Sequence, residues 1–537
     1  MTTINERSQS VDIDQMLQIV GEYGWFQKIV NIIFCIMMFP AAFPCLIAYF
    51  SVQSPAWKCN LNSTICNNKS ATYNSNDTTR CSPQMKRSDW DYVTSSSYSI
   101  VTEFDLVCNR EYLIQLQTSV LFFGFIFRAL IIGWCADNFG RKRVLFISLT
   151  AIIMVGFVSV FVGNIFVFIA CRFVIGFFLH GTYPQLYIMI SEIVGNKDRA
   201  FANNITFFSL GFAFCTLALK AYLLPNWRTL HIVCTAPYVF VLIFMKFVPE
   251  SVRYLRVKGE LDAAMAVFRR IAYWNKTIIP DNVTISPAST INHKASPLDL
   301  FRTRKMARVS CILGWSTFTV AMSFYCLYYT AGNISGHMYI DFVLITVLDI
   351  PASLILTPLV NKYGRKRCSM ALLLLAAASC MGLGFAPNHG QFKILRIILG
   401  MFGKTCNVLS GMAATTWRME LYPTTIRGEA GGLTQLTNKI GATCSPWLDA
   451  WLSTIHPGAV FIVIGVLMFV TALLQSLLWE TKGTNVGDTS DDDGGSAKTM
   501  DLSAPIEIRE SHLNDTFSDV SATNHTGYNL KDDTSCC

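Results

Sequence analysis

Two short stretches decide the fold: Asp137-Asn-Phe-Gly-Arg-Lys-Arg143 and Asn361-Lys-Tyr-Gly-Arg-Lys-Arg367, which begin 224 residues apart. Each is a Gly-Arg turn between two apolar runs of the length that crosses a bilayer, about 20 residues. Other charges recur at similar offsets: Arg172 as Arg396, Glu192 and Arg199 as Glu420 and Arg427, and Pro249-Glu250 as Trp479-Glu480. A repeat of this length predicts a chain of two related halves.

Outward from these turns the sequence has the composition of a membrane protein. Of the 537 residues, 52% are hydrophobic and 15% are charged, whereas soluble domains contain about 25% charged residues. We therefore predict an all-α membrane protein with twelve transmembrane helices in two pseudo-symmetric six-helix halves. The predicted spans are 29–50, 113–135, 144–163, 166–190, 201–223, 230–248, 308–330, 338–360, 368–386, 391–417, 428–452 and 458–479.

The distribution of Lys and Arg predicts the orientation of these spans. The net charge is +8, but the cations gather in short loops such as 141–143 and 362–367, which positions those loops in the cytosol and argues against a nucleic-acid partner. We expect a multi-pass protein of the plasma membrane with both termini cytosolic. The predicted regions are a cytosolic N-terminus (1–28), a first half (29–248) with an extracellular loop (51–112), a cytosolic linker with an amphipathic helix (249–307), a second half (308–479) and a disordered cytosolic tail (480–537).

The extracellular loop carries two signals that agree with this orientation. It contains three glycosylation sequons, and it holds the four cysteines that share a polar segment, which indicates an oxidising compartment. Three disulfide pairings among the four cysteines remain open. The sequons are at Asn62, Asn68 and Asn76, and the cysteines are Cys59, Cys66, Cys81 and Cys108.

Charged residues that recur in both halves are candidates for gating. An ionisable side chain near a membrane interface is costly alone and needs a partner. We predict a cytosolic charge cluster in each half that breaks and reforms. It consists of the Gly-Arg turn, the Arg early in span four or ten and the Glu at the end of that helix. The alternative is that these residues are ordinary positive-inside charges. The candidates are Asp137, Arg141, Arg172, Glu192, Arg199, Glu250 and Arg253, and Arg365, Arg396, Glu420, Arg427 and Glu480.

These motifs resemble the major facilitator superfamily and, more narrowly, its organic-ion transporter family, solute carrier family 22. The resemblance covers residues 20–483, and beyond the Gly-Arg turns its carriers are Gly24-Trp-Phe-Gln27, the Cys-bearing loop, Pro249-Glu-Ser-Val-Arg-Tyr-Leu255 and Glu420-Leu-Tyr-Pro-Thr-Thr-Ile-Arg427. It implies one substrate cavity between the halves, reached alternately from each side. It also implies no chemistry on the substrate, so that no enzyme activity, cofactor or metal site is expected.

The chain departs from the family pattern at a few positions. Val252 and Tyr254 replace the usual Pro and Trp, but Glu250 and Arg253 are kept. The second Gly-Arg turn begins with Asn361 instead of an acid, which predicts a weaker charge lock in that half. Arg128 stands where relatives have a small residue; pairing with a carboxylate and a direct role in the cavity are both open for it.

The charges deep in the spans bear on the substrate. Asp349 looks like the acid that the family has in span eight, and Lys439 falls where cation-selective relatives have Asp and anion or carnitine relatives have Arg. One acid and one base in a single cavity would suit a zwitterion, unless the two merely hold helices together. Tyr183, Tyr325 and Tyr339 resemble aromatic cavity positions of cation transporters, although packing is the alternative for each.

We therefore expect a secondary transporter of small organic ions that favours organic cations or carnitine-like zwitterions. An organic anion transporter is the main alternative, favoured by Lys439; a sugar-type transporter and a receptor on a transporter fold are weaker ones. Coupling to sodium or to a counter-substrate is open. The sequence contains no Gly-x-x-x-x-Gly-Lys-Ser/Thr motif, which disfavours a nucleotide-driven pump.

Overall fold

The structure is a computed structural model that describes most of the chain. All of the described ranges belong to one compact unit. A few side chains within helices, among them that of Tyr183, lie outside the description. The described residues are 9–60, 72–73, 79–82, 85–280, 282–287, 296–387, 390–423, 425–456 and 458–482, so that most of the predicted tail also lies outside them.

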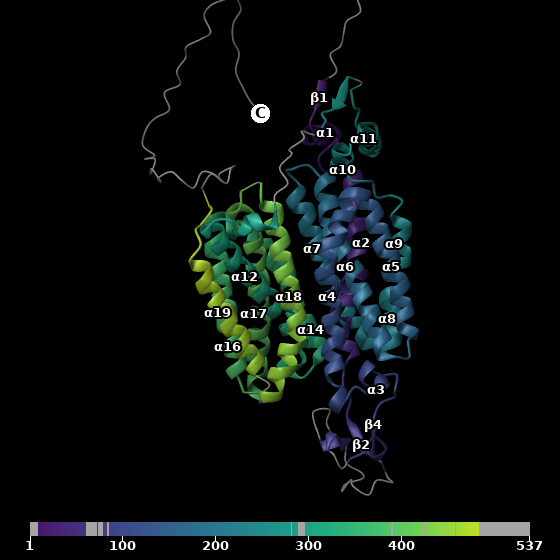
Figure 1. Ribbon diagram of the computed structural model, residues 1–537, viewed down its shortest axis with the longest axis vertical. Coiled ribbons are helices and arrows are strands. Elements are labelled where there is room, and N and C mark those ends of the chain that lie inside the picture. The colour runs from purple at the N-terminus through teal and green to yellow at the C-terminus, as the bar shows by residue number, and fades with distance from the viewer. Residues whose placement is uncertain are drawn as a thin grey trace, which may run out of the picture. The chain divides into compact units, whose positions relative to one another are not determined.

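Each of the twelve predicted spans falls on a helix or on a pair of helices in the described part of the chain, and the helices of each half lie together (Figure 1). The first half contains α2 (Trp25–Ser51), α4 (Tyr112–Phe139), α5 (Arg141–Phe161), α6 (Ile165–Ile193), α7 (Arg199–Leu223) and the pair α8 (Trp227–Thr235) and α9 (Pro237–Phe244). The second half contains α12 (Arg304–Tyr329), the pair α14 (Met338–Val347) and α15 (Asp349–Tyr363), α16 (Arg365–Phe385), α17 (Lys393–Leu421), α18 (Arg427–Ile455) and α19 (Ala459–Ser476).

Eight of these helical segments are long and apolar enough to cross a membrane, judged by length and composition within the described residues. The break between α14 and α15 puts Asp349 in the first turn of α15. Pro351 explains the break, since a proline clashes with the carbonyl four residues earlier, which here belongs to Val347, the last residue of α14.

The two halves meet through a few helix pairs. In the described part these are chiefly α4 with α18 and α7 with α14, and α7 also meets α15. The hydroxyl of Ser119 on α4 donates a hydrogen bond of 2.7 Å to the carbonyl of Thr443 on α18. These contacts leave faces of α7, α12, α17 and α18 turned toward the space between the halves.

A small domain lies in the loop predicted to be extracellular. Strands β2 (Trp57–Cys59), β3 (Thr72–Tyr73) and β4 (Trp90–Tyr92) form an antiparallel sheet in the order β3-β2-β4, around the buried Trp57. A disulfide joins Cys81 to Cys108, which decides one pairing that the sequence left open, and Cys59 is disulfide-bonded as well. The other cysteine and the three sequons, Cys66, Asn62, Asn68 and Asn76, lie outside the described residues.

The loop domain is tied to the helices by one carboxylate. Glu103, on the short helix α3 (Ile100–Phe104), accepts hydrogen bonds from the Arg228 guanidinium and, at 2.7 Å, from the Trp227 indole of α8. Short helical turns occur in other connections: α13 (Gly332–Ser335) and the 3-10 helices η1 (Thr79–Cys81), η2 (Arg87–Asp89), η3 (Cys108–Arg110), η4 (Pro297–Phe301) and η5 (Gly390–Phe392).

The linker packs with the N-terminal segment at the opposite side of the first half (Figure 1). Strand β1 (Gln9–Val11) pairs in parallel with β5 (Val283–Ile285) beside helices α1 (Ile13–Val20), α10 (Val252–Val257) and α11 (Leu261–Asn275). The amphipathic helix expected in the linker is α11, which buries Phe268 and Ile271. Asn275 then joins it to the membrane helices, because its amide accepts from the Phe26 N–H at 3.0 Å.

We predict that Gly140→Ala destabilises the protein by about 1–3 kcal/mol. Gly140 has φ +99°, and an added Cβ would lie 2.7 Å from a Glu250 carboxylate oxygen. Gly431→Ala is the matched control, because Gly431 is helical and its Cβ would meet no atom within 4 Å. Thermal unfolding of the purified variants measures the difference, and equal midpoints would contradict the prediction.

Candidate functional site

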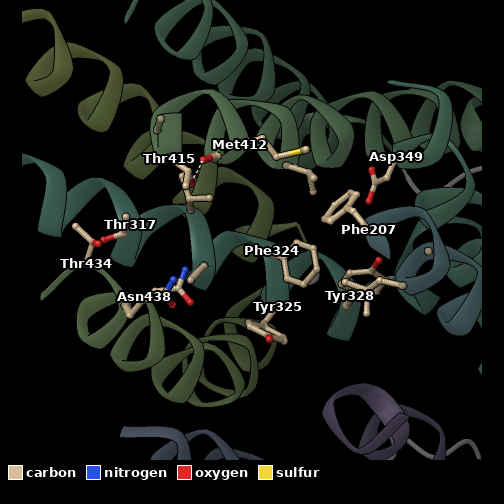
Figure 2. A pocket seen from close by; sticks show the side chains of 18 of the residues that line it. Phe207, Thr317, Phe324, Tyr325, Tyr328, Asp349, Met412, Thr415, Thr434 and Asn438 are labelled. Atoms are coloured by element: carbon tan, nitrogen blue, oxygen red, sulfur yellow. Dashed lines mark hydrogen bonds between the residues drawn. The ribbon is translucent and has the colours of Figure 1, made fainter. Parts of the chain in front are cut away.

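A cavity of about 360 Å³ lies between the two halves (Figure 2). Helix α7 of the first half supplies one wall, and helices of the second half supply the others. Its lining side chains are mostly apolar and aromatic, with a few polar groups, as is usual for sites that bind small molecules. The side chains that line it include those of Phe207, Thr317, Phe324, Tyr325, Tyr328, Asp349, Thr415, Arg418, Thr434 and Asn438.

The two ends of this cavity differ in chemistry. At one end the Asp349 carboxylate lies near the rings of Phe207 and Tyr328 (Figure 2). The other end includes the Thr317 hydroxyl, the Asn438 amide and the Arg418 guanidinium. A molecule that spans the cavity would therefore meet an acidic, aromatic surface at one end and hydrogen-bonding groups with one cation at the other.

Asp349 has a buried partner that the sequence reasoning missed. The Lys404 ammonium, on α17, forms an ion pair with Asp349 and a hydrogen bond of 2.9 Å with the Tyr328 hydroxyl. The Thr405 hydroxyl donates a second hydrogen bond to Asp349, at 3.2 Å. Because Lys404 is 0% exposed, its charge is balanced by this carboxylate and not by water.

The other predicted substrate residues are divided by the structure. Tyr325 lines the cavity, as Asp349 does. Tyr339 lies outside it and stacks on Phe50 at 5.6 Å, and the Lys439 ammonium lies 5.3 Å from the Phe125 ring, also away from the cavity lining. The side chain of Tyr183 is outside the described residues. Asp349 therefore pairs with Lys404, whereas the sequence had left open a pair of Asp349 with Lys439.

Stacked aromatic rings join the two halves beyond the Asp349 end of the cavity. Tyr49 and Phe50, at the end of α2 in the first half, stack on Phe342 and Tyr339 of α14 in the second half, each at a centroid distance of 5.6 Å. These residues belong to the helix ends that the sequence predicts to be extracellular. The cavity instead reaches Arg418 and Thr434, near the predicted cytosolic ends of α17 and α18.

The charges after the first Gly-Arg turn form a compact cluster. Arg141 forms an ion pair with Glu192, and the hydroxyl of Ser251 donates to the same carboxylate. Glu250 accepts hydrogen bonds of 3.0 Å from the backbone N–H groups of Arg141 and Lys142, which are the first residues of α5. A carboxylate at this position satisfies free N–H groups and interacts favourably with the helix dipole.

The second half repeats this cluster residue by residue. Arg365 Nε lies 3.0 Å from Glu420, Thr481 donates to the same carboxylate, and Glu480 accepts from the backbone N–H groups of Arg365 and Arg367 at 3.0 and 3.2 Å. Burial alone would raise the pKa of Glu480, but the backbone N–H groups at the start of α16 outweigh it and lower that pKa below its ordinary value. The carboxylate therefore stays charged at neutral pH.

Two of the predicted cluster members lie elsewhere. Arg172 donates to the carbonyl of Pro44 at 3.1 Å, and Arg396 donates to that of Ile334 at the same distance. Each arginine is near the start of a helix that carries the cluster glutamate at its other end. Since 20 helical residues rise about 30 Å, neither arginine can reach the cluster at the Gly-Arg turn, and the structure does not bring these two residues into it.

Two of the four remaining candidates contact an acid that was not predicted. Asp14, in α1, forms ion pairs with Arg199 at 3.4 Å and with Arg253 at 3.1 Å. Arg427 donates to the carbonyl of Tyr422, at 3.4 Å, and Asp137 is exposed at the end of α4. The N-terminal segment therefore contributes to the charges of the first half, whereas the sequence motifs pointed only to the loops and the linker.

Comparison with known proteins identifies the family. Residues 45–349 match the profile of the family described as "Sugar (and other) transporter", and residues 311–520 match the "Major Facilitator Superfamily". The chain is 31% identical over 409 residues to "Solute carrier family 22 member 3" of Mus musculus. The aligned region covers 75% of this chain and 73% of the relative. The chain belongs to solute carrier family 22. It is therefore a multi-pass membrane transporter of the major facilitator superfamily.

Two further relatives and a solved structure agree with this. The chain is 26% identical to an "Organic cation transporter-like protein" of Drosophila melanogaster (87% of this chain, 90% of the relative) and 28% identical to "Organic cation/carnitine transporter 4" of Arabidopsis thaliana (86% and 87%). The partially occluded inward-open xylose transporter XylE from E. coli aligns with a TM-score of 0.60 at 17% identity over 86% of this chain and 99% of that one. The twelve-helix major facilitator fold is thereby confirmed.

We predict that Asp349→Asn and Lys404→Met each lower stability by about 3–5 kcal/mol, because each leaves the other charge buried without its partner. The double variant is expected to recover most of this loss. Surface expression and thermal unfolding of the four proteins, measured as a double-mutant cycle, give the coupling. Additive losses would show that the pair does not stabilise the fold.

Proposed function

We propose that this family 22 chain carries small organic cations and carnitine-like zwitterions across the plasma membrane by alternating access, with both termini in the cytosol. The observation that carries the proposal is the acidic, aromatic end of the cavity, where Asp349 lies beside Phe207, Phe324 and Tyr328. Aromatic faces and a carboxylate together are the groups that hold an organic ammonium. Relatives named as organic cation and carnitine transporters support the same substrate class.

The protein's own lysine supports the choice of an ammonium. The Lys404 Nζ lies 4.7 Å from the centroid of the Tyr328 ring and 5.5 Å from that of Phe324. An internal ammonium thus already interacts with the faces that we assign to the substrate. A bound cation would share these rings and the Asp349 carboxylate with Lys404, so that binding weakens the internal ion pair.

A negatively charged group on the substrate also has a counterpart in the cavity. Arg418 lines it, with its guanidinium 2.5 Å from the Thr415 hydroxyl, on a helix that also carries Lys404. A zwitterion can place its ammonium at the Asp349 end and its carboxylate toward Arg418. The same two cations favour the second candidate, an organic anion transporter, which has Arg418 and Lys404 as its binding charges.

Uptake in cells that express the chain decides among these substrates. We expect uptake of tetraethylammonium or carnitine above that of untransfected cells, and none of para-aminohippurate, each with and without a sodium gradient. Hippurate uptake alone would overturn the cation proposal in favour of the anion transporter. A dependence on sodium would identify the coupling ion, which the geometry leaves open.

Substitutions of Phe324 test the aromatic end within the same assay. Phe324→Leu should raise the KM for the cation about 2- to 30-fold, because one ring face contributes about 0.5–2 kcal/mol. Phe324→Tyr keeps the ring and should leave KM nearly unchanged. Equal KM values for the leucine and tyrosine variants would remove Phe324 from the binding site.

The two charge clusters are proposed to control the movement between inward-facing and outward-facing states. Each cluster ties the start of one helix, α5 or α16, to the end of another within the same half. Helices held in this way can move as one body, which is how repeats of such transporters rock about a central site. The ion pair of Arg141 with Glu192 is the contact whose loss should affect this movement most directly.

We predict that Arg141→Ala lowers the maximal uptake rate about tenfold, equivalent to about 1.4 kcal/mol of barrier, with little change in KM. Arg367→Ala is the control, because Arg367 is exposed and its side chain makes no hydrogen bond or ion pair to a described residue. Initial rates are compared at matched surface levels. A normal rate for Arg141→Ala would remove the pair from the transport cycle.

A further inference from the structure

A second hollow, of about 750 Å³, lies beside the charge cluster of the first half. We call it the basic groove, and it is formed by the end of α4, the start of α5, the end of α9 and the following α10. Three cations line it: Lys142, Arg143 and Lys246. It is separate from the substrate cavity, with which it shares no lining residue.

The cations of the basic groove are available to a ligand. None of their side chains makes a hydrogen bond or ion pair to a described residue, and Arg143 and Lys246 are exposed. Two acids also line the groove. Glu250 is already engaged by the backbone N–H groups at the start of α5, so that the exposed Glu260 is the acid that remains to oppose an anion.

The second half shows that this arrangement is not a general result of the fold. There Lys366, the counterpart of Lys142, uses its ammonium to bind the carbonyls of Ser476, at 2.8 Å, and Leu478. Ser476 is itself the counterpart of Lys246, because the two positions are 230 residues apart, as Glu250 and Glu480 are. The first half therefore has one more cation here, Lys246, and the ammonium of Lys142 makes no such hydrogen bonds with described residues.

The groove also has an apolar side. Phe146 and Ile147, one turn further along α5, line it and are 46% and 58% exposed. Exposed apolar side chains on a membrane helix face acyl chains. Cations at the end of a span and apolar groups directly beyond them match the two parts of a phospholipid, the headgroup and the first acyl carbons.

We propose that the basic groove binds an anionic phospholipid of the cytosolic leaflet, whose headgroup phosphate contacts Lys142, Arg143 and Lys246 while its acyl chains lie along Phe146 and Ile147. The proposal depends on the orientation given under the proposed function, but not on the substrate. Since the backbone N–H of Lys142 donates to Glu250, a lipid held here lies directly against the cluster that we assign to gating.

The test measures lipid binding to the purified full-length protein without substrate. The protein is placed in nanodiscs of phosphatidylcholine with a titrated fraction of fluorescent phosphatidylserine, and bound lipid is read by energy transfer from its tryptophans. Each cation near a membrane surface contributes about fivefold to the affinity for anionic lipid. Lys246→Ser, which copies the second half, should weaken binding about fivefold, and Lys142→Gln with Lys246→Ser about 25-fold.

Arg367→Gln is the control, since it removes from the second half the counterpart of Arg143, outside the basic groove, and should not change lipid binding. Wild-type affinity in the double variant, or equal binding of fluorescent phosphatidylcholine, would overturn the proposal. Displacement of the lipid by millimolar inorganic phosphate would also overturn it, because it would indicate a site for a small anion. Lipid binding that is specific in a protein without uptake activity would overturn the proposed substrate but keep this inference.

Discussion

The structure depends on one constraint: a charge that is buried among the membrane helices, or that lies at a helix start, must be balanced by the protein itself. In the middle of the second half, Lys404 is balanced by Asp349 and by the Tyr328 hydroxyl. At the ends of the spans, Glu250 and Glu480 are balanced by the backbone N–H groups of the helices that follow. Because an unbalanced charge in a span costs several kcal/mol, these contacts decide how the helices around them are placed.

The same constraint explains which parts of the duplication are kept. Glycine at 140 and 364 has positive φ and leaves room for the glutamate that accepts from the next residues. The second hydroxyl donor is Ser251 in one half and Thr481 in the other, which are chemically equivalent. Asn361 replaces an acid, yet the ion pair of that half joins Arg365 to Glu420 and does not involve position 361. The weaker lock that Asn361 suggested is therefore not visible in this cluster.

Sequence reasoning predicted the twelve spans, the two halves and the core of each charge cluster. The lengths of the apolar runs and the positions of the repeated charges directly indicate where a residue lies across the membrane. It missed the partner of Asp349, since the depth of Lys404 is readable but the direction of its side chain around α17 is not. For the same reason it did not predict that the Lys439 ammonium lies over the Phe125 ring. The distance of Arg172 from the cluster could be predicted: span four begins at a loop without Lys or Arg, so that a residue early in that span lies at the opposite side from the Gly-Arg turn.

The arrangement of contacts between the halves indicates which way the cavity opens. No ion pair between described residues joins one six-helix half to the other, so that separating the ends of the halves near the Gly-Arg turns breaks none of them. At the other side, Tyr49 and Phe50 stack on rings of α14 across the boundary, and each such pair contributes about 0.5–1.5 kcal/mol. With the orientation that we propose, these two features of the chain favour an inward-facing state. Opening to the outside must replace the stacked rings with new contacts at the cytosolic ends, where the two clusters supply the available charges.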